Sequence, residues 1–304
     1  MSKKVFVSYC HRQGKWVWHR LVPCLKAGGA EVFVDRERFE AGKGVVGQMD
    51  ATQDAADMSV LVLAPEYLSS PYCRHEMERA IARDPRFRKG CVIPVRRAPC
   101  ALPDVIKLPN PLYVDLCNDK DAAAWKLLLD SCGADLGATA PDWLKARDDV
   151  VRFLRRNQSV NLVVKGHPRY RQLIHHIRED FQPELGIVDL DQGPTASRPG
   201  LVAEILTACG APASVPPVPG DLAVLHRVLS ARPGSAVALL HFDHVQHREY
   251  YDVDLFSALR VLLMDSRKLV LLAQSRTPFA ALLPKTHPLS SIDMKTVELQ
   301  GQPV

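Results

Sequence analysis

Short apolar runs alternate with longer amphipathic segments along the N-terminal 132 residues of the chain. Continuous apolar runs of four to eight residues are typical of strands that are covered on both faces. Runs of this kind occupy 4–9, 31–35, 59–64, 92–95 and 112–116. Amphipathic segments that predict helices lie at 16–25, 46–55, 71–81 and 121–132. Strands that alternate with helices in this way predict an α/β fold with a doubly wound parallel sheet.

The stretch from Met58 to Ile81 joins a buried strand to the start of a helix. Ser-Ser-Pro at 69–71 supplies hydroxyl caps and a proline suited to the first helical turn. Glu76 and Glu78 follow in the opening turns, where a carboxylate complements the positive end of the helix dipole. The same place, beyond the carboxyl end of a strand, is where open α/β sheets bind ligands. We therefore expect Glu76 to be exposed at the helix start, available to a small molecule.

A turn-rich segment at 133–141, GADLGATAP, separates this pattern from a second one. Its small residues predict a linker. The chain would then consist of a first domain at 1–134, a linker at 135–141 and a second domain at 142–304. A length of 304 residues is sufficient for two domains with cores of their own.

The second domain repeats the alternation of apolar runs and amphipathic segments. Asp142 is expected to cap a helix that continues through Leu154. Buried strands are predicted at 160–164, 237–242 and 269–273, with helices between them. This pattern predicts a second α/β domain.

Composition is that of a globular protein and argues against several classes. Apolar residues make up 47% and charged residues 24% of the chain, which are ordinary values. The net charge of +5 is spread along the sequence, so a nucleic-acid partner is not expected. No apolar run approaches the ~20 residues of a membrane span, and Met-Ser-Lys-Lys leads into a strand-like run without a signal-peptide core. We expect a cytoplasmic protein with no membrane partner.

The cysteines and histidines do not form a metal-binding pattern. The eight cysteines include no C-x-x-C pair. His241, His244 and His247 lie close together in sequence. A strand that ends near Phe242 would place His241 and His244 on a different face from His247. No metal site is therefore expected.

Three segments of the first domain resemble Toll/interleukin-1 receptor-like (TIR) domains, whose sheet is flavodoxin-like. Ser-Ser-Pro-Tyr-Cys-Arg-His-Glu at 69–76 is similar to the segment that carries the catalytic glutamate of TIR domains. Phe6-Val7-Ser8-Tyr9 resembles their first box, without the acidic residue that usually follows it. Val32-Phe33-Val34-Asp35, followed by Gly42, resembles the second strand and the loop that gates the nucleotide pocket.

The resemblance implies that NAD is the substrate, that its nicotinamide–ribose bond is cleaved, and that no cofactor is required. The nicotinamide ring is a cation that leaves as a neutral base, so one carboxylate is sufficient. Glu76 would stabilise the ribosyl cation that develops, Ser8 and Tyr9 would form the pocket floor, and Arg36 or Lys43 would meet the pyrophosphate. The substrate-binding residues implied in this way are Ser8, Tyr9, Asp35, Arg36, Gly42, Lys43 and Tyr72.

A response-regulator receiver has the same topology and is the main rival. It needs an acidic pair after the first strand to hold Mg²⁺ and an aspartate after the third. Ser8-Tyr9 and Ala64-Pro65 stand at those places. The receiver interpretation is therefore rejected.

The second domain resembles, in layout, the ATPase core of bacterial STAND or AAA-type proteins. Lys165 to Arg171 follows the first strand, where a phosphate-binding loop would lie. Such a loop needs glycines that bring successive N–H groups close to phosphate, whereas Pro168 removes a donor and no Lys-Ser or Lys-Thr follows. Asp243-His244 stands where Walker B acids would lie. We expect a P-loop NTPase-like core without an intact P-loop and without ATP hydrolysis.

These resemblances together predict an NAD-cleaving effector in bacterial signalling or antiphage defence, releasing nicotinamide and plain or cyclised ADP-ribose. The expected partners are other copies, through TIR–TIR contacts, and a separate sensor or activator that binds residues 142–304. Assembly through the second domain would switch the enzyme on. Two alternatives stay open: a noncatalytic TIR adaptor, and a nucleotide-binding switch in the second domain.

Overall fold

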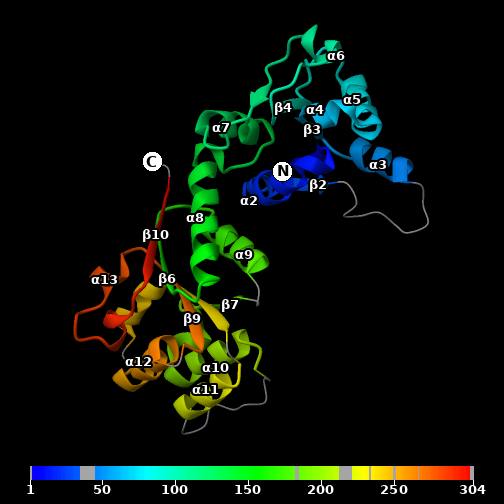
Figure 1. Ribbon diagram of the computed structural model, residues 1–304. Helices are drawn as coiled ribbons and strands as arrows, with labels where there is room; N and C mark the ends of the chain where they lie inside the picture. The colour runs from blue at the N-terminus through cyan, green and yellow to red at the C-terminus, as the bar shows by residue number, and fades with distance from the viewer. Residues whose placement is uncertain are drawn as a thin grey trace. The chain divides into compact units, whose positions relative to one another are not determined.

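The chain divides into two compact units, which are Met1–Leu144 and Lys145–Val304 (Figure 1). The computed structural model describes residues 2–34, 45–181, 185–211, 221–232, 234–248, 251–265 and 267–301. Within these ranges, no helix is long and apolar enough to cross a membrane.

Unit 1 is built on a five-stranded parallel sheet with the order β2-β1-β3-β4-β5. Its strands are β1 (Lys4–Ser8), β2 (Glu31–Val34), β3 (Met58–Leu63), β4 (Val92–Arg96) and β5 (Val114–Asp115). β1 is an inner strand, since Val5 pairs with Val32 of β2 on one side and with Met58 of β3 on the other. The expected doubly wound α/β sheet is confirmed. The strand predicted at 112–116 contains only two residues.

Helices follow each of the five strands of unit 1. They are α1 (Gly14–Trp16), α2 (Val22–Ala27), α3 (Val45–Asp54), α4 (Pro65–Ser69), α5 (Pro71–Arg83), α6 (Asp104–Lys107) and α7 (Ala122–Ser131). Between α1 and α2 the backbone widens into a π-helical segment at Val17–Leu21, where the Val22 N–H donates to the Val17 carbonyl. Pro23 explains the widening, because proline has no N–H to donate and its ring clashes with the preceding turn.

The segment predicted as a linker, 135–141, is folded. Leu136 is buried, Gly137–Thr139 forms a 3₁₀ turn, and α8 (Ala140–Leu154) begins two residues before Asp142. The Asp135 N–H donates to the Gly28 carbonyl at 2.8 Å. A Cβ on Gly28 would lie 2.6 Å from the Cβ of Ala134. Close packing against Ala134 therefore requires glycine at position 28, and the division between the units falls within α8.

Unit 2 contains a second five-stranded parallel sheet, with the order β10-β6-β9-β8-β7. Its strands are β6 (Val160–Lys165), β7 (Leu185–Asp189), β8 (Ser235–Leu240), β9 (Leu269–Ser275) and β10 (Lys295–Gln300). Its helices after α8 are α9 (Tyr170–Asp180), α10 (Arg198–Ala208), α11 (Asp221–Ser230), α12 (Val253–Arg260) and α13 (Phe279–Leu282). Sequence patterns predicted β6, β8 and β9 but neither β7 nor β10.

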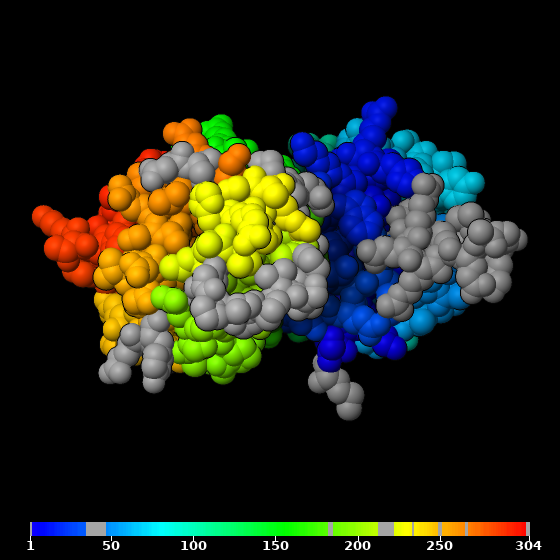
Figure 2. Space-filling view, turned by 90° about the horizontal axis from the view of Figure 1, so that it is seen from below, coloured from blue at the N-terminus to red at the C-terminus, as the bar shows by residue number. Residues whose placement is uncertain are grey.

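One face of the unit 2 sheet is covered by α10, α11 and α12. Their apolar side chains form a single core cluster with those of β7, β8 and β9. Figure 1 shows the three helices together on one side of the sheet, and Figure 2 shows the outer surfaces of α11 in yellow and α12 in orange. The carboxyl ends of the strands are left to the loops, and polar side chains gather there.

Candidate active site and the carboxyl edges of the two sheets

Glu76 lies on the buried face of α5. Ser70 caps this helix, with its side chain accepting from the Cys73 N–H at 3.4 Å. Cys73, Glu76, Met77, Ala80 and Ile81 are the buried residues of α5, which is helical spacing along one face. Glu76 is only 5% exposed, so the expectation that it is exposed was wrong. Glu78, two residues later, is the exposed carboxylate.

The Glu76 carboxylate is hydrogen-bonded at the carboxyl end of β1. The Ser8 hydroxyl, which ends that strand, donates to Glu76 Oε2. The Ser8 Oγ also lies 2.7 Å from the hydroxyl of Tyr67, which α4 positions after β3. Ser8 and Tyr67 are 1% and 0% exposed. β1 thus meets the consecutive helices α4 and α5 in one buried group, the hydroxyl–carboxylate cluster of Ser8, Tyr67 and Glu76.

The cluster keeps Tyr67 in its neutral form. Burial raises the pKa of Tyr67 well above its ordinary value, the hydrogen bond with Ser8 opposes this, and the nearby Glu76 carboxyl raises the pKa further. Tyr67 was not among the residues predicted for the site. The only signal in the sequence was an aromatic residue two positions after the proline that ends the strand.

Contacts between α3 and α5 hold Glu76 in position. The fully buried Gln53 side chain donates from Nε2 to the Glu76 backbone carbonyl at 2.9 Å. Arg83 donates to the Gln53 carbonyl at 2.9 Å, and Arg79 forms an ion pair with Asp54 at 2.5 Å. The main chain at Glu76 is therefore fixed from a neighbouring helix, leaving its carboxylate directed at Ser8.

The other predicted site residues divide into three groups. Tyr9 is 8% exposed, and its hydroxyl accepts from the Trp18 indole N–H at 3.0 Å, beside the cluster. The Cys73 thiol lies 3.7 Å from the Tyr9 carbonyl. Tyr72 is 62% exposed and is not part of the buried group. The remaining four, Asp35, Arg36, Gly42 and Lys43, lie outside the described residues.

A family model described as a TIR domain matches residues 5–129, the sheet of unit 1 and its helices up to α7. Residues 5–129 are a TIR domain. Human Toll-like receptor 1 is 28% identical over 72 residues, which are 24% of this chain and 9% of the receptor. Bovine Toll-like receptor 6 shows the same identity over the same shares. The chain thus corresponds to a small part of the length of these relatives.

Two solved structures are similar to different parts of the chain. The TIR domain of the Toll-related receptor TRR-2 from Hydra magnipapillata covers 43% of this chain and 98% of its own, with 19% identity and a TM-score of 0.38. The ORC1 protein of Aeropyrum pernix, solved in complex with DNA, covers 53% of this chain and 45% of its own, with 14% identity and a TM-score of 0.42.

The carboxyl edge of the unit 2 sheet carries a different polar group. β8 ends at Leu240, two residues earlier than predicted, and His241 has a left-handed backbone with φ 54° and ψ 44°. His241 Nδ1 lies 2.6 Å from Asp189 Oδ1 at the end of β7, and His241 Nε2 lies 2.9 Å from the hydroxyl of Tyr170. Arg171 pairs with the other oxygen of Asp189 at 3.1 Å. We call these four residues the histidine–aspartate cluster.

The early end of β8 corrects one expectation. His241, rather than Asp243, follows the strand, and Asp243 accepts from the Arg276 N–H at 2.8 Å. The rings of His241 and His244 meet edge to face with centroids 6.0 Å apart. Across the described part of the chain, no three His, Cys, Asp or Glu side chains are placed to hold a metal ion.

The turn that would be a phosphate-binding loop is closed by its own side chains. Gly166 has φ +72°, but His167 is buried, and Tyr170 and Arg171 are bonded to residues that end β8 and β7. Lys165 pairs with Glu298 of β10 at 3.0 Å. Lys165 and Arg171 of this turn thus form ion pairs with carboxylates of unit 2.

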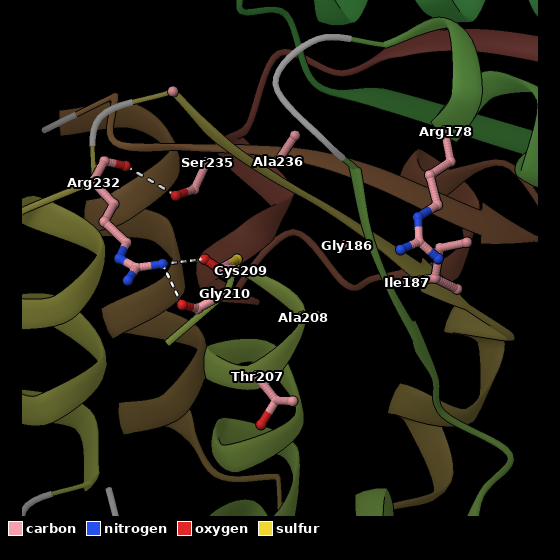
Figure 3. Close-up of a pocket in the computed structure, with 11 residues that line it drawn as sticks. Arg178, Gly186, Ile187, Thr207, Ala208, Cys209, Gly210, Arg232, Ser235 and Ala236 are labelled. Carbon is pink, nitrogen blue, oxygen red and sulfur yellow. Dashed lines mark hydrogen bonds between the residues drawn. The ribbon is translucent and has the colours of Figure 1, made fainter. Parts of the chain in front are cut away.

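A cavity of about 480 Å³ lies at the opposite edge of the same sheet (Figure 3). It is lined by residues that begin β7 and β8 and by the end of α10, with Arg178 and Arg232 on opposite sides. Arg232 donates to the carbonyls of Cys209 and Gly210. Burial raises the pKa of the Cys209 thiol to about 11, so it stays protonated at neutral pH. The cavity is remote from the carboxyl ends at which open sheets bind ligands.

Proposed function

We propose that the TIR domain cleaves the nicotinamide–ribose bond of NAD, with Glu76 as its catalytic carboxylate. The observation that supports this proposal is the buried Glu76 carboxylate, hydrogen-bonded by Ser8 beyond the carboxyl ends of β1 and β3. Placing a carboxylate in a water-poor site has a desolvation cost, and the hydrogen bond from Ser8 offsets part of that cost.

The reaction needs charge stabilisation rather than proton donation. The bonding electron pair of the C1′–N bond goes to the ring nitrogen, and nicotinamide leaves as a neutral base. A ribosyl cation develops at C1′, and the Glu76 carboxylate stabilises it more strongly in a low-dielectric site than it would in water. Water then adds to C1′ and loses a proton, which gives ADP-ribose. Attack by an adenine nitrogen instead of water would give a cyclic product.

Glu76→Gln is the direct test, with Glu78→Gln as its matched control on the exposed face of α5. We expect the first substitution to lower nicotinamide release on the order of 10²–10³-fold and the second to leave it unchanged. Unchanged turnover in Glu76→Gln, measured by chromatography of the products at a temperature where both variants are folded, would remove Glu76 from the mechanism.

The remaining contacts to NAD are assigned to Ser8 and Tyr9 at the pocket floor and to Tyr72 and the loop after β2. In that loop, Arg36, Lys43 or both are proposed to bind the pyrophosphate. Replacing either cation with alanine should raise the KM for NAD without an equal loss in kcat, because the pyrophosphate is bound equally in the ground and transition states.

We further propose that assembly of several copies switches the enzyme on, with unit 2 binding the separate activator. In this proposal, the loop after β2 completes the NAD site together with a neighbouring copy. A fragment comprising residues 1–144, which ends where unit 1 ends, should be much less active than the full chain supplied with its activator. Equal activity at all dilutions would contradict this.

A noncatalytic adaptor is the second candidate, and one observation favours it. Glu76 is 5% exposed, and its hydrogen bond with Ser8 ties α5 to β1, which is also what a structural carboxylate would do. An adaptor would keep its signalling function in Glu76→Gln while showing no NAD loss in the wild type. For unit 2, we expect from the paired side chains at 165–171 that ATP is not hydrolysed in the presence of Mg²⁺ and does not shift the melting temperature.

A further inference from the structure

We infer that Tyr67 is a positioning residue that acts through Ser8 to keep the Glu76 carboxylate ionised and fixed in orientation. The consequence for catalysis rests on the proposed function of Glu76. The hydrogen-bond arrangement itself does not, and it can be tested separately.

The directions of the two hydrogen bonds follow from the number of protons available. An ionised carboxylate has no proton and can only accept, so the Ser8 hydroxyl must donate to Glu76 Oε2. Ser8 has a single hydroxyl proton, which this bond uses. The contact of 2.7 Å between Ser8 Oγ and the Tyr67 hydroxyl therefore requires Tyr67 to donate. Tyr67, Ser8 and Glu76 form a relay in which every donor points towards the carboxylate.

A relay of this kind favours the charged form of Glu76. Burial alone disfavours a carboxylate, and hydrogen bonds donated to it favour it. Donation by Tyr67 polarises the Ser8 hydroxyl and strengthens its bond to Glu76. Water is a poor substitute, because Tyr67 and Ser8 are 0% and 1% exposed. If Glu76 were protonated, its O–H could donate to Ser8, and Ser8 would then donate to Tyr67. Both hydrogen bonds would run in the opposite direction.

Tyr67 is suited to this role by its surroundings. Burial raises its pKa well above the ordinary value, so it remains a donor through the neutral and moderately alkaline range. Besides Glu76, the titratable group that acts on the Tyr67 hydroxyl is the thiol of Cys73 on α5, which raises the pKa of Tyr67 further. His75 and Arg79, on the same helix, are engaged with Asp50 and Asp54 of α3. The phenol hydroxyl of Tyr67 is thus the group that reaches Ser8 from the β3 side.

The test uses the full chain with Tyr67→Phe, which removes one oxygen atom and keeps the ring. The acid limb of kcat/KM against pH reports the ionisation of the essential base in the free enzyme. We expect that limb to move to higher pH by about one unit in Tyr67→Phe. The plateau kcat should fall about tenfold because the carboxylate is less well held, with KM within about twofold. Ser8→Ala should show a larger change of the same sign, and Ser8→Thr, which keeps the hydroxyl, should shift the acid limb less than Ser8→Ala does. Tyr113→Phe, at the far edge of the sheet, should change nothing.

A second readout does not depend on turnover. The infrared carboxylate band of Glu76, isolated by subtracting the spectrum of Glu76→Gln, should persist to lower pH in the wild type than in Tyr67→Phe or Ser8→Ala. Unchanged titration of this band in all Tyr67 and Ser8 variants would overturn the relay, even if Glu76→Gln abolishes NAD cleavage. Turnover that survives in Glu76→Gln would instead overturn the proposed function, while the band would still decide the relay. A merely structural Tyr67 would lower the melting temperature and leave both pH profiles in place.

Discussion

The two units each bury an acidic side chain at the carboxyl edge of a parallel sheet, but they surround it differently. In unit 1, the Glu76 carboxylate accepts a hydrogen bond from the neutral hydroxyl of Ser8, which also lies next to the Tyr67 hydroxyl. In unit 2, Asp189 contacts the imidazole of His241 and the guanidinium of Arg171. Neutral donors stabilise a charge without cancelling it, whereas an ion pair with a guanidinium cancels it.

The hydroxyls of the unit 1 cluster carry no charge and do not neutralise the carboxylate beside them, whereas Arg171 neutralises Asp189 in unit 2. The unit 1 cluster is suited to a cationic transition state that arrives with the substrate. The unit 2 cluster already contains its cation and also ties the start of α9 to the ends of β7 and β8. The left-handed backbone of His241 has an energetic cost for a residue with a Cβ. The bonds of His241 to Asp189, Tyr170 and the Gln274 side chain offset that cost.

The largest contrast should appear in NAD cleavage when each acid is made neutral. Glu76→Gln should lose activity on the order of 10²–10³-fold, and Asp189→Asn should remain within about twofold of the wild type. Both are to be assayed at a temperature where circular dichroism shows the variants folded. A comparable loss in Asp189→Asn would mean that the unit 2 cluster also takes part in the reaction.

Removal of the Asp189 carboxylate, although it should hardly change NAD cleavage, should lower the stability of unit 2. Asp189→Ala leaves His241 and Arg171 without their carboxylate, and breaking a buried pair costs about 3–5 kcal/mol of unfolding free energy. We take the lower end, because the Arg171 side chain is 52% exposed. Asp191 lies at the same edge, but its side chain is 60% exposed. Asp191→Ala should therefore change the free energy of unfolding by less than about 0.5 kcal/mol. Denaturant unfolding monitored by hydrogen exchange in β7 and β8 would show equal losses if the cluster contributes nothing.

The two clusters should lose their contributions to stability at opposite ends of the pH scale. The pKa of Tyr67 is raised in the fold, chiefly by burial, so the stability it contributes is present below about pH 10 and is lost as pH rises further. Burial acts to raise the pKa of Asp189, but His241, the Asp191 amide and Arg171 outweigh it and lower the pKa. Its contribution is present above about pH 4 and is lost as pH falls.

Substitutions that remove each titration sharpen this test. Tyr67→Phe should flatten the alkaline limb of stability against pH for unit 1 only, and Asp189→Asn the acid limb for unit 2 only. Thermal unfolding between about pH 3 and pH 11 measures both limbs. If either substitution flattened the opposite limb, the assignment of charge states to the two clusters would be incorrect.

The smallest effect is expected away from both clusters, where the units should respond alike. Asp121 caps α7 by accepting from the N–H groups of Ala123 and Ala124, and Ser197 caps α10 by accepting from Gly200. Replacing either with alanine should cost about 1 kcal/mol of unfolding free energy. Clearly unequal losses, measured by denaturant titration, would show that the units differ in more than their polar edges.

Most of the unit 1 sheet was predictable, because each strand is a short apolar run between turn signals. The position of Glu76 after β3 was also predictable, from a motif, but its burial was not inferred from the motif alone. The spacing of Cys73, Met77, Ala80 and Ile81 would have revealed it, since Glu76 falls on the face that they share. The hydrogen bond between Ser8 and Tyr67 joins residues that are 59 positions apart, so no local sequence pattern indicates it.

The missed strands of unit 2 have physical reasons. β7 contains Gly186, which weakens a strand pattern. The glycine is needed there because a Cβ would lie 2.4 Å from the Ala208 carbonyl oxygen. β10 pairs with β6 alone and alternates buried with partly or fully exposed residues, so it lacks a continuous apolar run. The early end of β8 could not be predicted, because His241 adopts a backbone conformation that glycine or asparagine would normally signal.

The strand order of unit 2 has a consequence for synthesis on the ribosome. In unit 1, β1 can pair with β2 and β3 once residue 63 has emerged. In unit 2, β6 pairs with β9 and β10, so it waits until residues 269–300 are available. N-terminal domains generally fold first during translation. The nascent chain should therefore carry a finished TIR domain while the apolar strand β6 is still unpaired, and this interval is when unit 2 is most open to misfolding or to a chaperone.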